Sequence, residues 1–395
     1  MKFLSKINTV SSPAQEEILT TYNHIKTCAG KGHSTDLRNA EEKLADLLNQ
    51  SGLHDESREY FYELADSSTS FVDKSRLLRK VSSSYAAQRE YLKAQAVAEE
   101  ALTILRQANQ NEIDVLELFE ALTACAFSNY FISKSARLKE LIKEMRYHFH
   151  NITDKAVRLR FYFVVMLDML LRHRWYMLPE ESITHGEFYL QLALETQNWN
   201  TIGTAYSGLG FVHLWREEFE LARKNFEKAL EILQNRNFDL VLTSQVYITV
   251  SYRMQDNISM TEKWAAISLE VATKTQNQPY IALSYSNLAW VYARRNNWLY
   301  AEDYARMSIK LIASNRHPML FLCLFPLLEC LFKNEKYEEA GMYCFFLLHP
   351  SLKELPTSVN RKLELMNVAW LNNRTKEMAI CLDDVITEAK LTNYF

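Results

Sequence analysis

The sequence is poor in the residues that interrupt regular structure. Its 395 residues include only 8 glycines and 7 prolines. Because these two residues mark tight turns and end helices, their scarcity argues against a sheet protein with many hairpins. Leu, Ala, Glu, Lys, Gln and Arg are common, and all of them favour helices. We therefore expect an all-α protein with more than one core or an elongated repeat array.

The sequence also lacks an excess of charge of either sign. Lys and Arg total 45 against 48 Asp and Glu, and the net charge is −3. A general nucleic-acid binder carries a basic surface, so we expect no direct nucleic-acid partner. Two stretches with basic residues near aromatic ones, 137–150 and 158–175, are only weak signals of nucleic-acid binding. The first includes Glu140 and Glu144 at helical spacing, as a solvated amphipathic helix would.

Paired cysteines and long apolar runs are missing as well. The six cysteines are dispersed and form no CxxC pair, which predicts buried reduced thiols and a cytoplasmic location. The first residues, MKFLSKINTVSSPAQEE, contain no continuous apolar stretch, so we expect no secretory signal. The most apolar stretches, 161–171 and 319–332, each contain a carboxylate, whereas a membrane-spanning helix needs about 20 apolar residues. We expect two buried helices there and no membrane partner.

The sequence motifs of catalysis are absent. Neither GxxxxGK[ST] nor GxGxxG occurs, and no GxSxG or HExxH motif is present. His148 and His150 are two residues apart, which places them on different faces of a helix, and no Cys/His cluster has metal-ligand spacing. We therefore expect no catalytic site, no metal site and no cofactor.

What the sequence does contain is a repeat, clearest in AYSGLGFVHLWREEFELARKNFEKALEIL (205–233). With Gly203 as position 1, the pattern places Gly210 at position 8, Ala222 at 20, Phe226 at 24 and Ala229 at 27. Small residues at positions 8 and 20 allow two helices to cross closely, and the large residues fill the space beside them. The segment therefore predicts two antiparallel helices.

Four further units continue the same register. They start at Leu242, Ala282, Phe321 and Asn360, with spacings of 39, 40, 39 and 39 residues from one start to the next. In the unit at Leu242, Thr261 replaces the small alanine. A repeat of this length predicts helices of roughly 15–17 residues, about 24 Å long.

The N-terminal half carries the pattern more faintly. Units that start at Arg38 and Ser75 match at several positions, and helical periodicity alone places two poorer pairs, at 113–147 and 155–197. No long polar linker divides the chain. We expect three segments: an N-terminal helical cap at 1–36, degenerate repeats at 37–150, and repeats at 151–395 that continue the array and are clearest at 203–395.

This pattern resembles the tetratricopeptide repeat, whose usual length is about 34 residues. The longer spacing is similar to the degenerate arrays of bacterial regulators, such as the sensor region of the maltose-regulator type and the Rap/PlcR-type peptide receptors. The resemblance covers about residues 36–390 and implies a right-handed superhelical solenoid of antiparallel helix pairs. The residues before it are too few for the DNA-binding domain of PlcR-like receptors.

The resemblance also implies a binding face. In tetratricopeptide proteins, positions 2, 5, 9, 12 and 13 of the first helix line the inner surface. Those positions and one neighbour give a candidate groove of six residues: Phe211, Trp215, Arg253, Asn287, Trp290 and Arg294. Aromatic and arginine side chains anchor protein interfaces, and a carboxamide can bond a peptide backbone. The alternative is that the aromatic members pack between successive repeats as core.

Three functions are compatible with these features. The leading one is a non-catalytic scaffold that binds a protein or peptide and acts as sensor or adaptor in bacterial regulation. The second is a Rap-like regulator that controls a transcription factor or enzyme. A signal peptide or small molecule would switch its conformation. The third is the sensor region of a larger signalling protein. The sequence leaves the partner and the oligomeric state open.

Overall fold

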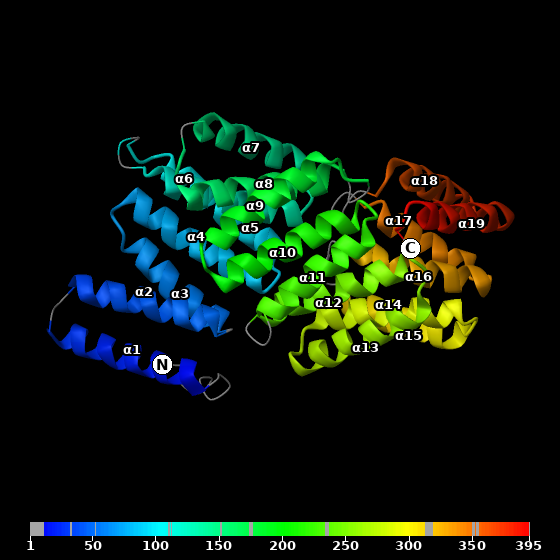
Figure 1. Cartoon of the computed structure of the whole chain (residues 1–395), viewed down its shortest axis with the longest axis horizontal. Helices are drawn as coiled ribbons and strands as arrows, with labels where there is room; N and C mark the ends of the chain where they lie inside the picture. The colour runs from blue at the N-terminus through cyan, green and yellow to red at the C-terminus, as the bar shows by residue number, and fades with distance from the viewer. Residues whose placement is uncertain are drawn as a thin grey trace. The chain divides into compact units, whose positions relative to one another are not determined.

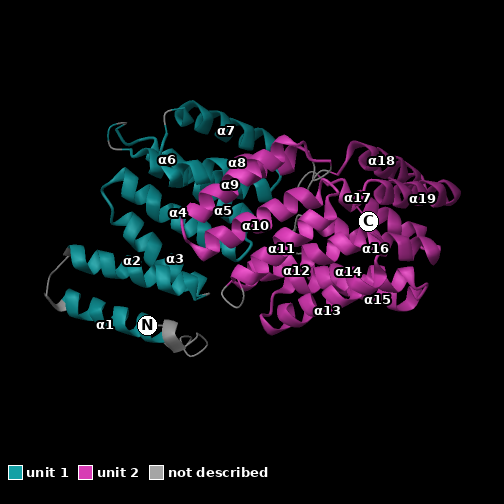
Figure 2. Cartoon of the chain, viewed as in Figure 1, with its two compact units in different colours: residues 1–164 teal, residues 165–395 magenta. Residues whose placement is uncertain are grey.

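The computed structural model describes residues 12–31, 34–51, 53–109, 111, 113–150, 152–173, 177–233, 237–312, 319–349, 352 and 355–394. These residues form nineteen helices and no strand (Figure 1). The predicted all-α class is confirmed. The chain divides into two compact units, unit 1 (residues 1–164) and unit 2 (residues 165–395), and the division falls within one helix, α8 (Figure 2).

Unit 1 holds seven helices and the first part of α8. Their bounds are α1 Ser12–Lys31, α2 Ser34–Gln50, α3 His54–Asp66, α4 Phe71–Ala87, α5 Tyr91–Leu105, α6 Val115–Phe131, α7 Ser135–Phe149 and α8 Lys155–Arg172. The helix α1 lies in the segment expected to be a helical cap, and its Ile18 packs with Leu44 and Leu48 of α2. The boundaries of the three predicted segments stay a prediction.

Unit 2 holds the rest of α8 and eleven further helices. Their bounds are α9 Glu181–Glu195, α10 Trp199–Leu214, α11 Phe219–Leu233, α12 Phe238–Arg253, α13 Ile258–Lys274, α14 Gln278–Arg294, α15 Trp298–Ile312, α16 Leu320–Lys333, α17 Tyr337–Leu347, α18 Thr357–Leu371 and α19 Thr375–Leu391. The pairs from α10/α11 to α18/α19 coincide with the five units predicted from the repeat. We call the first helix of each pair the A helix and the second the B helix.

Small residues bring the A and B helices together as the pattern predicts. A Cβ atom on Gly210 would lie 2.9 Å from the ring of Phe226 and 3.1 Å from the carbonyl oxygen of Ala222. Ala222, Phe226 and Ala229 have no exposed surface. The repeat positions of α10 and α11 are therefore packing positions, with no room for a larger side chain at the crossing.

In unit 1, serine takes the place of the small apolar residue. Ser57 Oγ donates to the carbonyl oxygen of Ala45 at 2.8 Å, and Ser82 Oγ donates to that of Ala94 at 2.7 Å. Both serines are buried, and each bond joins the A helix to the B helix where they cross. A buried hydroxyl is tolerated because it finds an acceptor. Serine at these positions keeps the helix crossing close but departs from the alanine and glycine of the repeat pattern.

In several tight turns between A and B helices, a residue other than glycine adopts the left-handed conformation. In unit 2, one residue in each of five such turns has a positive φ: Glu217 (64°), Asp256 (52°), Asn296 (57°), Glu335 (55°) and Asn373 (53°). Arg89, with φ of 62°, has the same place in unit 1. A left-handed residue commonly ends a helix, and glycine usually fills the position. Here polar side chains adopt that conformation, so the chain needs few glycines to fold back on itself.

The two most apolar stretches are buried helices, as expected. Every residue of α16 from Leu320 to Leu331 is buried. In α8, each residue from Val164 to Leu171 is less than a tenth exposed. Among the residues that the structure describes, no helix is both long and apolar enough to cross a lipid bilayer.

Candidate functional site

The six candidate groove residues all lie in unit 2, and five of them are buried. The exposed fractions are Phe211 8%, Trp215 3%, Arg253 2%, Asn287 2% and Trp290 1%. The side chain of Arg294 is 23% exposed. In this conformation a partner can therefore reach Arg294, whereas the other five belong to the packed interior. A groove lined by all six stays a prediction.

Phe211 and Trp215 contact other parts of unit 2. The ring centroid of Phe211 is 4.6 Å from that of Tyr247 on α12 and 5.9 Å from that of Trp215. The Trp215 ring lies 5.8 Å from Tyr394 and 6.4 Å from Phe321. These are the contacts of aromatic side chains that pack between repeats, which is the alternative that the sequence left open.

Arg253 on α12 joins three A helices. Its Nη1 donates to Oδ1 of Asn287 at 3.1 Å and to Oγ of Ser286 at 3.4 Å, both on α14. Its Nη2 donates to the carbonyl oxygen of Leu322 on α16 at 3.3 Å. Burial lowers the pKa of the Arg253 guanidinium to about 9, so it remains protonated near neutral pH. Asn287 thus uses its carboxamide oxygen for Arg253 in this structure, and not for the backbone of a partner.

Arg294, Glu329 and Lys390 form a charged cluster, contributed by α14, α16 and α19. Arg294 Nη1 donates to Glu329 Oε1 at 3.3 Å, and Lys390 Nζ donates to the same oxygen at 2.6 Å. The Glu329 side chain is 6% exposed, against 23% for Arg294 and 39% for Lys390. The Arg294 guanidinium also lies 5.1 Å from the ring centroid of Trp290. Two cations therefore lie at the solvent edge of a buried carboxylate, next to an aromatic ring.

Sequence reasoning missed Glu329, Lys390 and Tyr394. Glu329 occupies position 9 of the unit that starts at Phe321, so the inner-face positions could have identified it. Lys390 and Tyr394 lie at the end of the last B helix and after it, where the repeat assigns no inner-face position. No sequence signal connects them to residues near 215 or 329.

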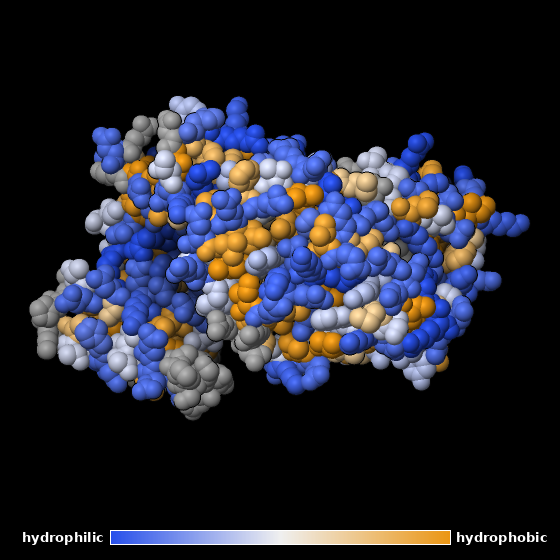
Figure 3. Space-filling view, viewed as in Figure 1, coloured by the Kyte–Doolittle hydropathy of each residue, from blue (hydrophilic) through white to orange (hydrophobic). Residues whose placement is uncertain are grey.

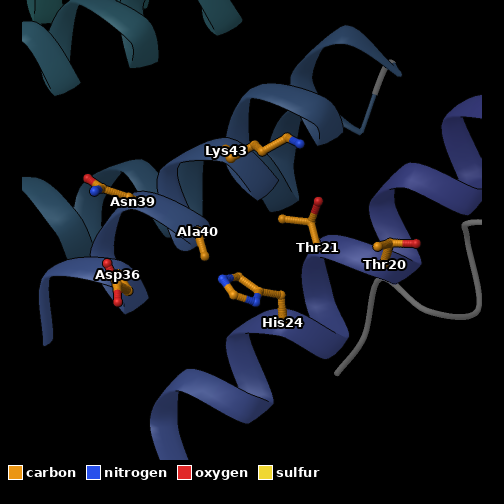
Figure 4. A pocket seen from close by; sticks show the side chains of 7 residues that line it. All are labelled: Thr20, Thr21, His24, Asp36, Asn39, Ala40 and Lys43. Atoms are coloured by element: carbon orange, nitrogen blue, oxygen red, sulfur yellow. The ribbon is translucent and has the colours of Figure 1, made fainter. Parts of the chain in front are cut away.

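A cavity of about 420 Å³ lies between α1 and α2 of unit 1 (Figure 4). Its lining residues are Thr20, Thr21, His24, Asp36, Asn39, Ala40 and Lys43. His24 Nε2 lies 3.4 Å from Cys28 Sγ, and Lys43 Nζ lies 3.1 Å from a Glu17 carboxylate oxygen. In the part of the chain that the structure describes, no group of three or more His, Cys, Asp or Glu side chains could hold a metal ion.

Hydrophobic patches interrupt a mainly hydrophilic surface (Figure 3). In unit 2, the large apolar side chains that are more than half exposed on α17, α18 and α19 are Met342, Phe345, Val368, Leu371, Ile380 and Leu391. Such exposure is compatible with an interaction surface, and equally with the uncovered side of the last helix pairs.

Comparison with known proteins finds similarity at the level of structure. Neither the family models nor the curated proteins searched match this sequence. The apo form of RapI is 12% identical with a TM-score of 0.52, over 80% of this chain and 87% of that chain. A Rap protein complexed with Competence and Sporulation Factor is 14% identical with a TM-score of 0.56, over 88% of this chain and 99% of that chain.

A third similar structure is a signal transduction ATPase (STAND) protein with a tetratricopeptide repeat sensor, from Pyrococcus horikoshii. It is 14% identical with a TM-score of 0.50, and the match covers 93% of this chain but 55% of that chain. Identities this low show the fold alone. Antiparallel helix pairs, small residues at their crossings and these three likenesses identify the fold as a tetratricopeptide-like helical solenoid of the type found in Rap proteins.

Proposed function

We propose that this chain is a non-catalytic helical-repeat scaffold, a sensor or adaptor that binds a protein or peptide through the A-helix face of unit 2. The observation that supports it best is the charged cluster of Arg294, Glu329 and Lys390 beside the Trp290 ring. Arginine and tryptophan are the side chains that most often dominate binding energy at protein interfaces. A partner can reach the two cations without any change in the buried residues beneath them.

The charge balance of this face favours an acidic partner segment. Arg253 is close enough to Arg294 for their charges to interact, which adds a third cation to the cluster. Two carboxylates oppose these three cations. They are Glu329 and the exposed Asp256, which lies 3.5 Å from Arg294 Nε. The chain as a whole carries a net charge of −3, so the local excess has the opposite sign. A partner carboxylate would form charge-assisted hydrogen bonds with Arg294 and Lys390.

A displayed library of linear peptides tests this proposal without knowledge of the natural partner. We expect selection on the wild-type chain to enrich peptides with acidic residues. Binding of the enriched peptides should weaken about tenfold or more in the double variant Arg294→Ala/Lys390→Ala, which corresponds to about 1.4 kcal/mol. Both side chains are partly exposed, but their loss removes two cations from the buried carboxylate of Glu329, so the comparison requires that the variant keeps the far-ultraviolet circular dichroism of the wild type.

A matched control removes the same charge elsewhere in unit 2. Arg295 pairs with Glu262 at 2.6 Å and Lys362 pairs with Asp384 at 2.7 Å, and both are partly exposed. Arg295→Ala/Lys362→Ala should bind the selected peptides as the wild type does, within about twofold, because surface pairs contribute little. If both double variants lose binding equally, net charge and not this face explains the result.

A ligand-controlled regulator is the second candidate. It is favoured by the likeness to a Rap protein complexed with Competence and Sporulation Factor, which spans 99% of that chain. Here a signal peptide or small molecule would shift the solenoid between two forms, and another surface would act on a transcription factor or enzyme. Small-angle scattering with and without a selected peptide tests it. An unchanged radius of gyration argues for a rigid adaptor.

The third candidate, the sensor region of a larger signalling protein, is favoured by the likeness to the STAND protein. In that protein the matched part is 55% of the chain. The candidate shares its binding face with the first, so the same library selection applies to it.

A further inference from the structure

Asn393 and Tyr394, which follow α19, contact residues after the end of α10 and at the start of α16. Asn393 has a φ of 55°, the left-handed conformation that ends a helix. The Tyr394 amide donates to the carbonyl oxygen of Ala389 at 2.8 Å, and the Asn393 amide to that of Lys390 at 3.2 Å. This pair of bonds is the Schellman motif, and it fixes the direction in which Tyr394 leaves the helix.

Tyr394 enters a site formed by residues far away in the sequence. Its ring centroid is 4.6 Å from Phe321 and 5.8 Å from Trp215. Tyr394 has no exposed surface, while Phe321 and Trp215 are 2% and 3% exposed. We call the site formed by Trp215 and Phe321 the aromatic slot. The Tyr394 ring covers both slot residues, so its departure would open an aromatic surface to solvent.

Two side-chain contacts near the surface anchor this segment. Asn393 Nδ2 donates to Oε1 of the exposed Glu217 at 2.7 Å, and Lys390 reaches Glu329 in the charged cluster. The neighbouring Leu391 is 71% exposed. Chain segments with exposed neighbours and side-chain anchors at the surface open at low cost compared with the core of a domain. Opening of this segment would break the Asn393–Glu217 and Lys390–Glu329 contacts and expose Tyr394, and it would leave the crossings of the A and B helices in place.

The slot also adjoins the face assigned to partner binding. Trp215 is one of the six predicted groove residues, and Lys390 is a member of the charged cluster. A peptide bound at Arg294 and Lys390 would compete with the residues that follow Lys390. Offset or edge-on aromatic packing is favourable beyond the area it buries, so an aromatic residue of the peptide is the fitting replacement for Tyr394.

We propose that the aromatic slot is a binding site for an aromatic side chain of a partner peptide, which Tyr394 occupies until that peptide displaces it. The matching ligand is a segment with an aromatic residue next to a hydrogen-bond donor, which would replace Asn393 on Glu217. The inference rests on the proposed peptide-binding function. It adds that one subsite takes an aromatic side chain and that Tyr394 of the same chain competes for that subsite.

The test uses the full chain and a labelled peptide of residues 388–394, EAKLTNY. In Tyr394→Ala the slot is vacated, so fluorescence anisotropy should show binding with a dissociation constant about tenfold or more below that of the wild-type chain. The peptide EAKLTNA should bind neither protein. Equal affinity of EAKLTNY for wild type and Tyr394→Ala overturns the proposal.

If circular dichroism shows that Tyr394→Ala is unfolded, a second variant tests the same proposal. Asn393→Ala removes the anchor of the resident segment and leaves both the slot and Glu217 available to the peptide. It should bind EAKLTNY more tightly than the wild type, and an unchanged dissociation constant contradicts the inference. Tyr147→Ala, at a side chain of unit 1 that is 80% exposed, is the control and should behave as wild type.

The two proposals fail in different ways. If the library selection succeeds and EAKLTNY binds no variant, the peptide-binding function stands and Tyr394 is a core residue only. If EAKLTNY binds Tyr394→Ala and no library peptide depends on Arg294 and Lys390, the slot stands and the proposed function is wrong.

Discussion

The two units connect their successive A helices by different chemistry. In unit 1, three ion pairs join α2 to α4, α4 to α6, and α6 to α8: Glu42–Lys80 at 2.7 Å, Arg79–Glu117 at 2.9 Å and Glu120–Arg160 at 2.9 Å. In unit 2, the corresponding contacts include one ion pair, Arg294–Glu329 at 3.3 Å, but also a Ser207–Ser244 hydrogen bond of 2.9 Å, the Phe211–Tyr247 ring pair and the Arg253–Asn287 bond. One architecture thus has a partly exposed, ion-paired face in unit 1 and a mostly buried one in unit 2.

The same repeat positions carry this difference. Position 9 is Asp46 in the unit that starts at Arg38, whereas four of the five repeats in unit 2 have an apolar residue there, among them Phe211 and Trp290, and the fifth has Glu329. All seven tryptophans of the chain follow residue 164. A solvated ion-paired face presents charges that are already matched, while a dry face can gain binding energy from aromatic contacts. This contrast is why the proposed partner site is assigned to unit 2.

One packing arrangement is common to both units. Arg58 in α3 and Arg223 in α11 each occupy position 21 of their repeat and stack on a tyrosine of the next A helix. The distances from guanidinium to ring centroid are 4.1 Å to Tyr85 and 4.4 Å to Tyr252. Each arginine also donates from Nη1 to the serine before that tyrosine, at 3.1 and 3.2 Å, and pairs with a carboxylate three residues earlier. This contact between repeats is therefore independent of the chemistry of the A-helix face.

The largest effect should come from position 9. Trp290→Ala removes a side chain that is 1% exposed and should lower the free energy of unfolding by about 3–5 kcal/mol. Asp46→Ala, at the same repeat position in unit 1, removes an exposed ion pair and should cost less than about 1 kcal/mol. Chemical denaturation followed by far-ultraviolet circular dichroism measures both. Similar losses in the two variants would remove the contrast between the faces.

Removal of the arginine contact that both units share should lower the free energy of unfolding equally in the two units. Arg58→Ala and Arg223→Ala each lose a buried guanidinium with its hydrogen bonds and its stacking, so each should cost about 2 kcal/mol. Tryptophan fluorescence reports unit 2 alone, because unit 1 has no tryptophan. Arg223→Ala should shift the fluorescence transition, and Arg58→Ala should shift only the circular dichroism of unit 1. An equal fluorescence shift in both variants would show that the units unfold as one body.

Acid should weaken unit 1 through Glu42. Burial opposes ionisation of this carboxyl, but hydrogen bonds from Arg76 and Lys80 outweigh it and lower its pKa from 4.5 to about 2. A lowered pKa in the folded state contributes stability above pH 4.5, and that stability is lost as the pH falls towards 2. After screening by solvent, we expect a contribution of about 1 kcal/mol.

Glu42→Gln checks this by denaturation at a series of pH values. The variant should be less stable than the wild type above pH 4.5, and the difference should disappear near pH 2. Glu59→Gln, at an exposed carboxylate on α3, is the control for the loss of one negative charge. A constant difference at every pH would mean that the substitution disturbs packing and not ionisation.

The smallest effect should be a gain in stability at the turns. Arg89→Gly in unit 1 and Glu335→Gly in unit 2 replace residues with φ of 62° and 55° by the residue that prefers this backbone. Each should raise the free energy of unfolding by up to about 1 kcal/mol, because the turn geometry is the same in both units. Glycine at the neighbouring Gln88, which has a negative φ, should destabilise instead. A loss at Arg89 or Glu335 would show that their side chains hold the turn.

Much of the fold could be predicted because it depends on local periodicity. Gly210, Ala222 and Ala229 reveal the helix crossing since only small residues fit there, and the regular spacing extends this to five pairs. The candidate site was predicted less well. The repeat shows which side of an A helix faces inward, but not how tightly successive A helices close upon one another. Arg253 reaches the Leu322 carbonyl two A helices away, and that closure buries five of the six candidate residues.

The sequence alone therefore determined the helix pairs, their register and the aromatic and basic character of one face, because each follows from side chains near one another in the chain. Tertiary structure decided which of those side chains solvent reaches. Trp215 was predicted to meet either a partner or the next repeat, and it contacts Tyr394, 179 residues further along. No periodicity records that contact, since it depends on the accumulated rotation of the intervening helix pairs.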